Sequence, residues 1–273
     1  MSRPRARAID ALRRLGARPR LAPLHAVYLG APTVRPSLPF AVREMMRRRN
    51  LVLYRIRENG CTVAIRHGAA AVVILGEVFN RHYYQPSGEV EQVLAEARTI
   101  VDLGGNIGLF GLFAAVRWPQ ARIVAFEPDP ENATLHEMTI AANGLGDRWE
   151  LIRAAASNRD GRVSFVAGLN AVSHIADATG SEQAIEVPML DVLPRIAQAD
   201  LLKMDIEGGE WAILGDPRFR QAPPRAVVLE YHSYLCPGPD PRAEAEHALR
   251  AAGMRVQSTS DRGDGHGMLW AWR

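Results

Sequence analysis

The feature that most constrains the fold is a regular alternation of strand-like and helix-like segments from residue 98 onward. The expected strands are short and apolar and lie at 98–104, 121–128, 149–157, 161–167, 199–208, 225–232, 254–260 and 267–273. The expected helices lie at 107–118, 130–144, 209–216 and 241–253. This alternation predicts an α/β fold whose parallel sheet is covered by helices on both faces. Because only a short link joins the last two strands, we expect them to pair antiparallel at one edge of the sheet.

Residues 1–97 do not follow this pattern and divide into two parts. Residues 1–36 are expected to form a basic, partly disordered extension, because the first 20 contain seven arginines and a single acid, Asp10. This composition has two alternative interpretations. One is an arm that binds membrane or nucleic acid, and the other is an organelle transit peptide. Residues 37–97 are expected to form an accessory region with a helix at 37–50, a β-hairpin of 51–57 and 61–67, a further strand at 71–79 that runs into a turn or helix, and a loop at 81–90.

Composition argues against several classes of protein. No apolar run approaches the roughly 20 residues that a membrane span needs, and no secretory segment is evident. Cys61 and Cys236 are too few for a disulfide framework and lack metal-ligand spacing. A reducing, cytoplasmic location is therefore expected. The net charge of +3 is only a weak indication of nucleic-acid binding.

Glycines and acids gather where the expected strands end, which is where open α/β sheets bind their ligands. Gly104 and Gly105 let the backbone turn tightly after the first strand, and Asp102 precedes that turn. Glu127 ends the next strand, where an acid can accept hydrogen bonds from both hydroxyls of a ribose. The glycine spacing differs from the G-x-G-x-x-G of dinucleotide sites. A nucleoside ligand without phosphate fits better, and S-adenosylmethionine is the common one.

Five segments, in this order, carry a family resemblance: VDLGGNIGLF, VAFEPDPENATLHEMTIAANG, AAASNRDGRVSF, VPMLDVL and LLKMDIEGGEWAIL. They resemble the FkbM family of S-adenosylmethionine-dependent methyltransferases, over about residues 98 to 232. The resemblance implies a class I methyltransferase (Rossmann-like) fold for 98–273, with a seven-stranded, mostly parallel sheet whose last strand is antiparallel, next to the N-terminal accessory region. Two positions depart from the family: Gly105 replaces the usual alanine, and Val192 replaces a usual acid, so no role rests on Asp191.

The resemblance also implies the cofactor contacts. The methionine end of the cofactor should be lined by Asp102, Gly104, Gly105 and Asn106. Glu127 should hold the ribose, and Ala155 and Ser157 should border the adenine. Residues 77–90 resemble the segment that caps the cofactor in this family, so Glu77 and Tyr83 should close over it.

Residues 203–210 read KMDIEGGE and contain the only lysine of the chain, Lys203. Side chains 203 and 205 point to the same face of a strand, so both should reach the site beyond its end. Methyl transfer to a hydroxyl is an in-line displacement that needs a positioned base or a metal. In one interpretation Asp205 is that base, or an orienting carboxylate, and Lys203 tunes it. In another, Lys203 forms only a structural ion pair with Glu207 or Glu210.

A third interpretation is a metal site. Asp205 and Glu207, with Glu230 or His232 from the next strand, would bind a hard divalent cation such as Mg²⁺ that acidifies the hydroxyl. His232 is alternatively a general base or a satisfied structural histidine. His174 is a weaker candidate base, in a loop at 168–190 that should help to recognise the acceptor together with 37–90.

The function expected from these features is O-methylation of a hydroxyl on a small molecule, either a sugar or a secondary metabolite. A nucleic-acid methyltransferase of the same fold is the alternative, although the chain lacks the Asn/Asp-Pro-Pro-Tyr/Phe run that amino-methylating enzymes use. The glycine spacing disfavours a nicotinamide oxidoreductase. The acids at the strand ends disfavour a non-catalytic scaffold. The oligomeric state is not predicted.

Overall fold

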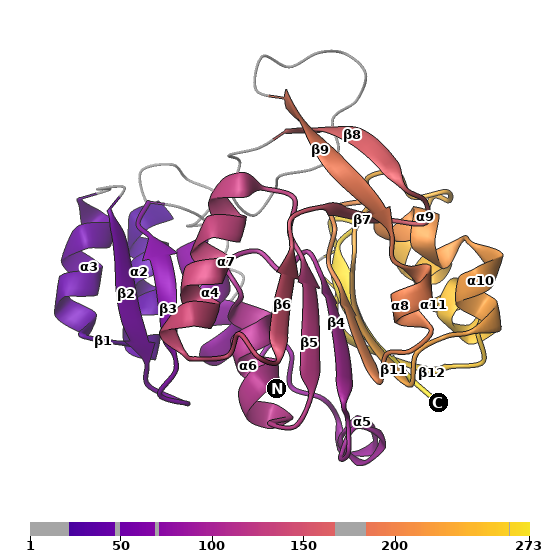
Figure 1. Ribbon diagram of the computed structural model, residues 1–273, viewed down its shortest axis with the longest axis horizontal. Coiled ribbons are helices and arrows are strands. Elements are labelled where there is room, and N and C mark those ends of the chain that lie inside the picture. The colour runs from indigo at the N-terminus through magenta and orange to yellow at the C-terminus, as the bar shows by residue number, and fades with distance from the viewer. Residues whose placement is uncertain (1–21, 47–49, 69–70, 167–183, 262) are drawn as a thin grey trace.

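A computed structural model describes residues 22–46, 50–68, 71–166, 184–261 and 263–273. Its centre is a seven-stranded sheet (Figure 1). In spatial order the strands are β12 (Arg255–Asp261), β13 (Gly267–Trp272), β11 (Ala226–Tyr231), β10 (Leu201–Met204), β4 (Thr99–Leu103), β5 (Arg122–Phe126) and β6 (Trp149–Ile152). Neighbours from β11 to β6 are parallel, whereas β13 is antiparallel to both β11 and β12. The predicted sheet and its antiparallel ending are confirmed.

Each face of the sheet is covered by its own hydrophobic core. Ile100 and Leu201 point to a core shared with α6 (Leu109–Arg117), α7 (Pro130–Ala142) and α5 (Gly88–Val93). Val101 and Leu202, one residue further along the same strands, point to a second core. The helices on that side are α8 (Leu193–Ile196), α9 (Glu210–Leu214), α10 (Pro217–Gln221) and α11 (Pro241–Ala251). Burial on both faces explains why these strands are predominantly apolar.

Three of these helices begin with the same dipeptide. Asp129-Pro130, Asp216-Pro217 and Asp240-Pro241 place an aspartate at the N-cap and a proline at the first helical position of α7, α10 and α11. Each aspartate accepts a hydrogen bond from a backbone N–H of the first turn, and proline has no N–H to leave unsatisfied there. These local signals fix where the helices start.

The accessory region is a second small unit beside α7 (Figure 1). It contains α2 (Ala22–Gly30), η1 (Ala31–Thr33), α3 (Ser37–Met45), α4 (Ala71–Phe79) and a sheet of β1 (Val34–Arg35), β2 (Leu51–Ile56) and β3 (Thr62–Arg66). The predicted hairpin is confirmed as β2 and β3. Part of the expected N-terminal extension is folded, because α2 packs on α3 and α4. Residues 1–21 lie outside the described residues.

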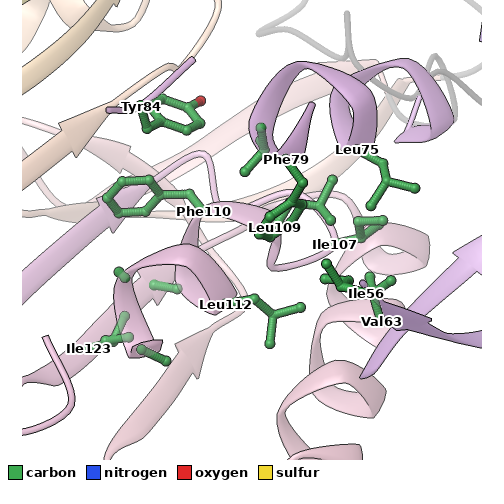
Figure 2. Packing of buried hydrophobic residues seen from close by; sticks show 14 of the residues in the cluster. Ile56, Val63, Leu75, Phe79, Tyr84, Ile107, Leu109, Phe110, Leu112 and Ile123 are labelled. Carbon is green, nitrogen blue, oxygen red and sulfur yellow. The ribbon is translucent and has the colours of Figure 1, made fainter. Parts of the chain in front are cut away.

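The prediction of a strand at 71–79 was wrong, since these residues form helix α4. The run of β-branched residues suggested a strand, but the buried positions Val72, Leu75, Val78 and Phe79 have helical spacing. Gly76 permits the packing, because a Cβ there would lie 2.5 Å from Cβ of Leu29 in α2. Figure 2 shows Leu75 and Phe79 in one apolar cluster with Leu109 and Ile107, which joins the accessory region to α6.

The segment 149–157 is two strands rather than one. β6 ends at Ile152 in the central sheet, and β7 (Ala155–Ser157) belongs to a separate sheet with β9 (Ala184–Asp191) and β8 (Gly161–Val166). Residues 184–190 of the loop expected at 168–190 belong to strand β9, and residues 168–183 lie outside the described residues. His174 lies outside the described residues. No helix in the described part of the chain is long and apolar enough to cross a membrane.

Candidate active site

The turn between β4 and α6 can be built only with glycine at its first position. Gly104 has φ 78°, and a Cβ on it would lie 1.8 Å from the backbone oxygen of Asp205. The N–H groups of Gly104 and Gly105 both donate to the carbonyl of Phe126, at 3.0 and 2.9 Å. The turn is therefore held between β10 and β5, at the carboxyl end of the sheet.

Glu127 connects this turn to the next one. Its carboxylate accepts hydrogen bonds from the N–H of Asn106 (2.7 Å) and from the N–H of Asp129 (2.9 Å). Burial raises the pKa of Glu127 to about 7, although these two backbone hydrogen bonds act to lower it. Glu127 is thus a buried acid whose charge is poorly compensated within the protein.

A cavity opens above these two turns. Its volume is about 870 Å³ when the part open to solvent is included, which is within the usual range for small-molecule sites. The residues predicted to contact the cofactor that line it are Gly104, Gly105, Asn106, Glu127 and Ala155. Asp102 and Ser157 are not among the lining residues. This cavity is called the first cavity below.

Sequence reasoning missed most of the apolar wall of the first cavity. That wall includes Ile74, Val78, Tyr84, Leu109, Phe110, Phe126, Ala156 and Phe165. Ile74 and Val78 lie on one face of helix α4, and the prediction of a strand for this segment did not indicate that face. Their i, i+4 spacing was the available signal.

A second cavity adjoins the first and is strongly acidic. It is lined by Glu77, Tyr83, Glu230, His232, Asp264 and His266, and it shares Ile74, Val78, Tyr84, Asp205 and Glu207 with the first cavity. The lining therefore contains five carboxylates and two histidines, and among the described residues no lysine or arginine. Glu77 and Tyr83, which were expected to close over the cofactor, line this second cavity. Asp205 and Glu207 face both cavities.

Lys203 is buried beneath this shared wall. Its ammonium donates to the carbonyls of Leu103 (3.1 Å) and Gly104 (2.5 Å) and lies 3.3 Å from Asp102 and 3.7 Å from Asp205. Burial alone would lower the pKa of Lys203, but the charges of Asp102 and Asp205 outweigh it and raise the pKa. The ion pairs considered with Glu207 or Glu210 were the wrong ones, since Asp102 and Asp205 take those places.

Glu210 instead orients His232. Its carboxylate accepts hydrogen bonds from Nδ1 of His232 (2.9 Å), from the N–H of His232 (2.8 Å) and from the N–H of Gly208 (2.8 Å). Nε2 of His232 is thereby turned toward Glu207 Oε2 (3.5 Å) and Asp205 Oδ1 (3.8 Å).

The surroundings of His232 favour its charged form. Burial lowers its pKa, but the hydrogen bond to Glu210 and the charges of Glu210, Asp205 and Glu207 raise it to about 9. In this state His232 is a cation near neutral pH and has no free lone pair with which to act as the general base considered above.

Asp205, Glu207 and His232 form a group that can hold a metal ion, because their ligand atoms all lie within 4.8 Å of one another. Glu230, the other predicted ligand, lines the second cavity but is outside this group. Two carboxylates and an imidazole suit a divalent cation such as Mg²⁺ or Mn²⁺. Glu207 adopts φ 52°, a left-handed conformation that is uncommon for residues other than glycine and is often found at functional sites.

Comparisons with known proteins give several matches. The profile of the methyltransferase FkbM domain matches residues 102–251, which include Gly104, Glu127, Asp205 and His232. Methyltransferase 1 of Beauveria bassiana is 29% identical over 140 residues, which are 42% of this chain and 56% of that protein. Ribosomal RNA small subunit methyltransferase G of Frankia alni is 28% identical over 159 residues, or 57% and 59% of the two chains.

A further relative matches this chain over a longer stretch. The 31-O-demethyl-FK506 methyltransferase FkbM of Streptomyces tacrolimicus is 28% identical over 216 residues, or 64% of this chain and 79% of that protein. The first two relatives are matched over little more than half of their length. A solved O-methyltransferase family protein from Burkholderia thailandensis aligns with a TM-score of 0.44 at 16% identity, over 75% of this chain and 58% of that one. That likeness is too low to carry a conclusion.

Proposed function

The chain belongs to the FkbM family of methyltransferases, and from this premise we propose that it transfers a methyl group from S-adenosylmethionine to a hydroxyl of a small molecule. The observation that carries the proposal is the wall shared by the two cavities. Asp205 and Glu207 face both the cavity built on Gly104 and Glu127 and the acidic cavity beside it. A donor in the first cavity and an acceptor in the second would meet at these carboxylates.

In this proposal the first cavity holds S-adenosylmethionine. Glu127 binds the ribose hydroxyls, Gly104 to Asn106 pass along the methionine end, and Ala155 borders the adenine. Tyr84 lines both cavities, so it covers the junction at which the sulfonium methyl would lie. The apolar wall around it would exclude water from the transfer.

Transfer requires the acceptor hydroxyl to lose its proton as its oxygen attacks the methyl carbon. The new O–C bond forms while the S–C bond breaks, and S-adenosylhomocysteine leaves with the electron pair. Asp205 is the residue we propose to receive the proton or to orient the hydroxyl, because it faces both cavities. Lys203, at 3.7 Å, and His232, at 3.8 Å, flank its two oxygens and compensate its charge.

A divalent cation is the second way to promote the loss of that proton. Asp205, Glu207 and Nε2 of His232 would hold it, and Glu210 would orient the imidazole from behind, as outer carboxylates do in metal sites. A bound Mg²⁺ would lower the pKa of a coordinated hydroxyl. His232 would then bind as the neutral imidazole, so metal binding would release its proton.

The test is release of S-adenosylhomocysteine from S-adenosylmethionine against a panel of sugars and hydroxylated secondary metabolites, with and without a chelator. Turnover with a hydroxylated acceptor supports the proposal. Loss of that turnover in chelator and its return with Mg²⁺ assign the metal, whereas full turnover in chelator assigns Asp205 alone. Binding of S-adenosylhomocysteine measured by calorimetry is the control for an intact first cavity. If NAD binds in place of S-adenosylhomocysteine, the proposal is wrong.

Methylation of nucleic acid is a second candidate function. It is favoured by the similarity to a ribosomal RNA methyltransferase and by the arginines of residues 1–20. Incubation with labelled S-adenosylmethionine and total RNA or DNA tests it. Label in nucleic acid, combined with no turnover on the hydroxyl panel, would replace the small-molecule proposal.

A further inference from the structure

Charge is distributed very unevenly along this chain. Residues 1–68 contain 15 arginines and three acids, whereas residues 69–273 contain 18 basic and 27 acidic residues. The net charge of +3 therefore conceals a strongly basic N-terminal part and an acidic remainder. Such asymmetry is typical of a chain whose basic part meets an anionic partner. The methyl-transfer site lies wholly in the acidic part and does not account for it.

The same N-terminal part exposes apolar side chains. Of the ten large apolar residues that are exposed in the described part of the chain, eight lie between residues 24 and 53. Five of them are on α2 and α3 and a sixth, Met46, caps the end of α3; we call these six the α2–α3 apolar face: Leu24, Tyr28, Leu38, Val42, Met45 and Met46. Isolated exposed apolar residues are normal, but a concentration of this kind marks an interaction surface.

The apolar face has helical order. Leu24 and Tyr28 are four residues apart on α2 and are 52% and 57% exposed. Leu38, Val42 and Met45 follow at intervals of four and three on α3, where Leu38 is 75% exposed. The opposite sides of the two helices are buried, with Leu29 and Phe40 1% and 0% exposed. Since α2 packs on α3, each helix buries one stripe and presents the other to solvent.

Exposed arginines lie on the small sheet beside these helices, where Arg35 and Arg55 share the face opposite to Tyr54, the residue on which Phe40 of α3 packs. Arg35, Arg55 and Arg57 are exposed, and the hydrogen bonds of Arg55 and Arg57 go to backbone carbonyls and to Ser37, which do not neutralise their charge. Exposed apolar residues in a strongly basic part of a chain are the composition of a surface that lies on an anionic bilayer, with aliphatic side chains among the acyl chains and guanidinium groups at the phosphates.

We propose that the α2–α3 apolar face docks the protein on an anionic lipid surface, to which the basic composition of residues 1–68 attracts it. Nucleic acid would account for the arginines but not for the exposed aliphatic and methionine side chains, because phosphate binding uses none of these. A second copy of the chain would account for the apolar face, but a two-fold contact would bring two strongly basic regions together. An anionic bilayer satisfies both observations. The inference does not depend on the proposed methyl acceptor.

Vesicle flotation with the full chain tests the proposal. The probes are vesicles of phosphatidylcholine alone and vesicles with about 30% phosphatidylglycerol. We expect the bound fraction to rise at least about tenfold with phosphatidylglycerol and to fall when salt is raised to about 0.5 M. Deletion of residues 1–20 should lower binding to the anionic vesicles by about tenfold or more. Equal binding to both kinds of vesicle would overturn the proposal.

Matched surface variants separate the apolar face from general effects. Leu38→Glu combined with Val42→Glu should lower binding at least about tenfold. Val116→Glu and Leu235→Glu change residues that are 49% and 56% exposed elsewhere, and they should leave binding unchanged. If the α3 double variant binds vesicles like the unchanged chain, the apolar face is not the docking surface.

Two further outcomes would identify a different occupant. A mass in solution of twice 30.0 kDa that falls to 30.0 kDa in the α3 double variant would show that a second copy covers the face. Competition by short RNA or DNA duplexes, with unchanged duplex binding by the double variant, would show that the basic region binds nucleic acid instead. Either outcome replaces the lipid proposal.

Discussion

Two buried glutamate–histidine pairs, one in the accessory region and one in the candidate active site, have nearly the same geometry. In the accessory region Nδ1 of His67 lies 3.0 Å from Glu44, and in the site Nδ1 of His232 lies 2.9 Å from Glu210. All four residues are buried. The pairs differ at the other ring nitrogen. Nε2 of His67 lies 2.8 Å from the hydroxyl of Tyr54.

Nε2 of His232 has no such close partner among the described residues and faces Glu207 and Asp205, at 3.5 and 3.8 Å, on the wall of the second cavity. The difference shows what separates a structural histidine from one available to a ligand. Burial and a glutamate partner are common to both, so neither identifies a site. What distinguishes His232 is the second nitrogen, which lies among carboxylates at a cavity. The following predictions test whether this distinction holds.

The largest effect is expected at Asp205, the carboxylate that faces both His232 and the two cavities. Asp205→Asn should lower turnover about 10²- to 10⁴-fold, because loss of a positioned base or ligand removes most of the assistance to proton transfer. Affinity for S-adenosylhomocysteine, measured by calorimetry, should change by less than about threefold. Asp191→Asn is the matched control, because Asp191 also ends a strand but pairs with Arg218 and lines neither cavity. Equal turnover of the two variants would remove Asp205 from the mechanism.

Lys203 should show the next largest effect, on stability. It contacts Asp102, which is fully buried, and Asp205, which is on the cavity wall. Lys203 therefore pairs with one structural carboxylate and with the carboxylate proposed to act in the reaction. Lys203→Met should lower the free energy of unfolding by about 3–5 kcal/mol, because Asp102 is left buried without a counter-ion. Urea unfolding measures the change. Adding Asp102→Asn to Lys203→Met should recover part of the loss. No recovery would mean that the hydrogen bonds of Lys203 to Leu103 and Gly104 dominate.

The two histidines provide the direct comparison. His232→Gln should lower turnover about 10- to 100-fold, as is typical when a group that supports a reacting carboxylate or a metal is lost. His67→Gln should leave turnover within about twofold and lower the free energy of unfolding by about 1–3 kcal/mol, because it disturbs the buried hydrogen bonds of the ring to both Glu44 and Tyr54. Steady-state kinetics and urea unfolding of both variants separate the two effects. If the turnover losses were equal, the proposed distinction between the pairs would fail.

The sequence predicted the fold from residue 98 onward well, because the signals there are local and repeated. Apolar strands, Asp-Pro helix starts and the short final link each act within a few residues. The error at 71–79 arose because the run of β-branched residues outweighed the helical spacing of the apolar positions, and the close packing of Gly76 against Leu29, more than forty residues away, is not visible in the local sequence. The division of 149–157 also depends on distant pairing, since β7 leaves the central sheet to pair with β9.

The sequence indicated which residues form the site, but not all of the ion pairs and hydrogen bonds between them. The residues at the strand ends were identified, because strand ends meet at one edge of a parallel sheet. Of their pairs, one interpretation had Lys203 beside Asp205, as the structure has it, and another had a lysine pair with Glu207 or Glu210. The pair with Asp102 was not predicted, because the parallel register sets Lys203 beside Asp102 of β4, a hundred residues away along the chain. Glu210 is then free to hold His232 of β11. Register between distant strands is information that one sequence does not carry locally.

The smallest effect is expected at Glu127, a buried acid whose carboxylate accepts hydrogen bonds from backbone N–H groups and not from a histidine. Glu127 lines the first cavity, and burial raises its pKa to about 7. If its ionised form binds the ribose hydroxyls, affinity for S-adenosylhomocysteine should fall by up to about tenfold as the pH drops from about 8 to about 6. The stability of the ligand-free protein should change in the opposite sense. A carboxyl whose folded pKa is raised contributes stability that is complete below its unfolded pKa, near 4.5, and that is lost as the pH rises through 7.

Calorimetry and urea unfolding at several pH values measure the two trends of Glu127 separately. Glu127→Gln should weaken binding at high pH and flatten both profiles, because the amide does not titrate. Glu44→Gln, in the accessory pair, is the control: it removes a buried carboxylate whose partners are His67 and Gly68, so it should leave the pH dependence of cofactor affinity unchanged. If Glu127→Gln kept the pH dependence, or if Glu44→Gln abolished it, protonation of a carboxylate facing the first cavity would not be what cofactor binding senses.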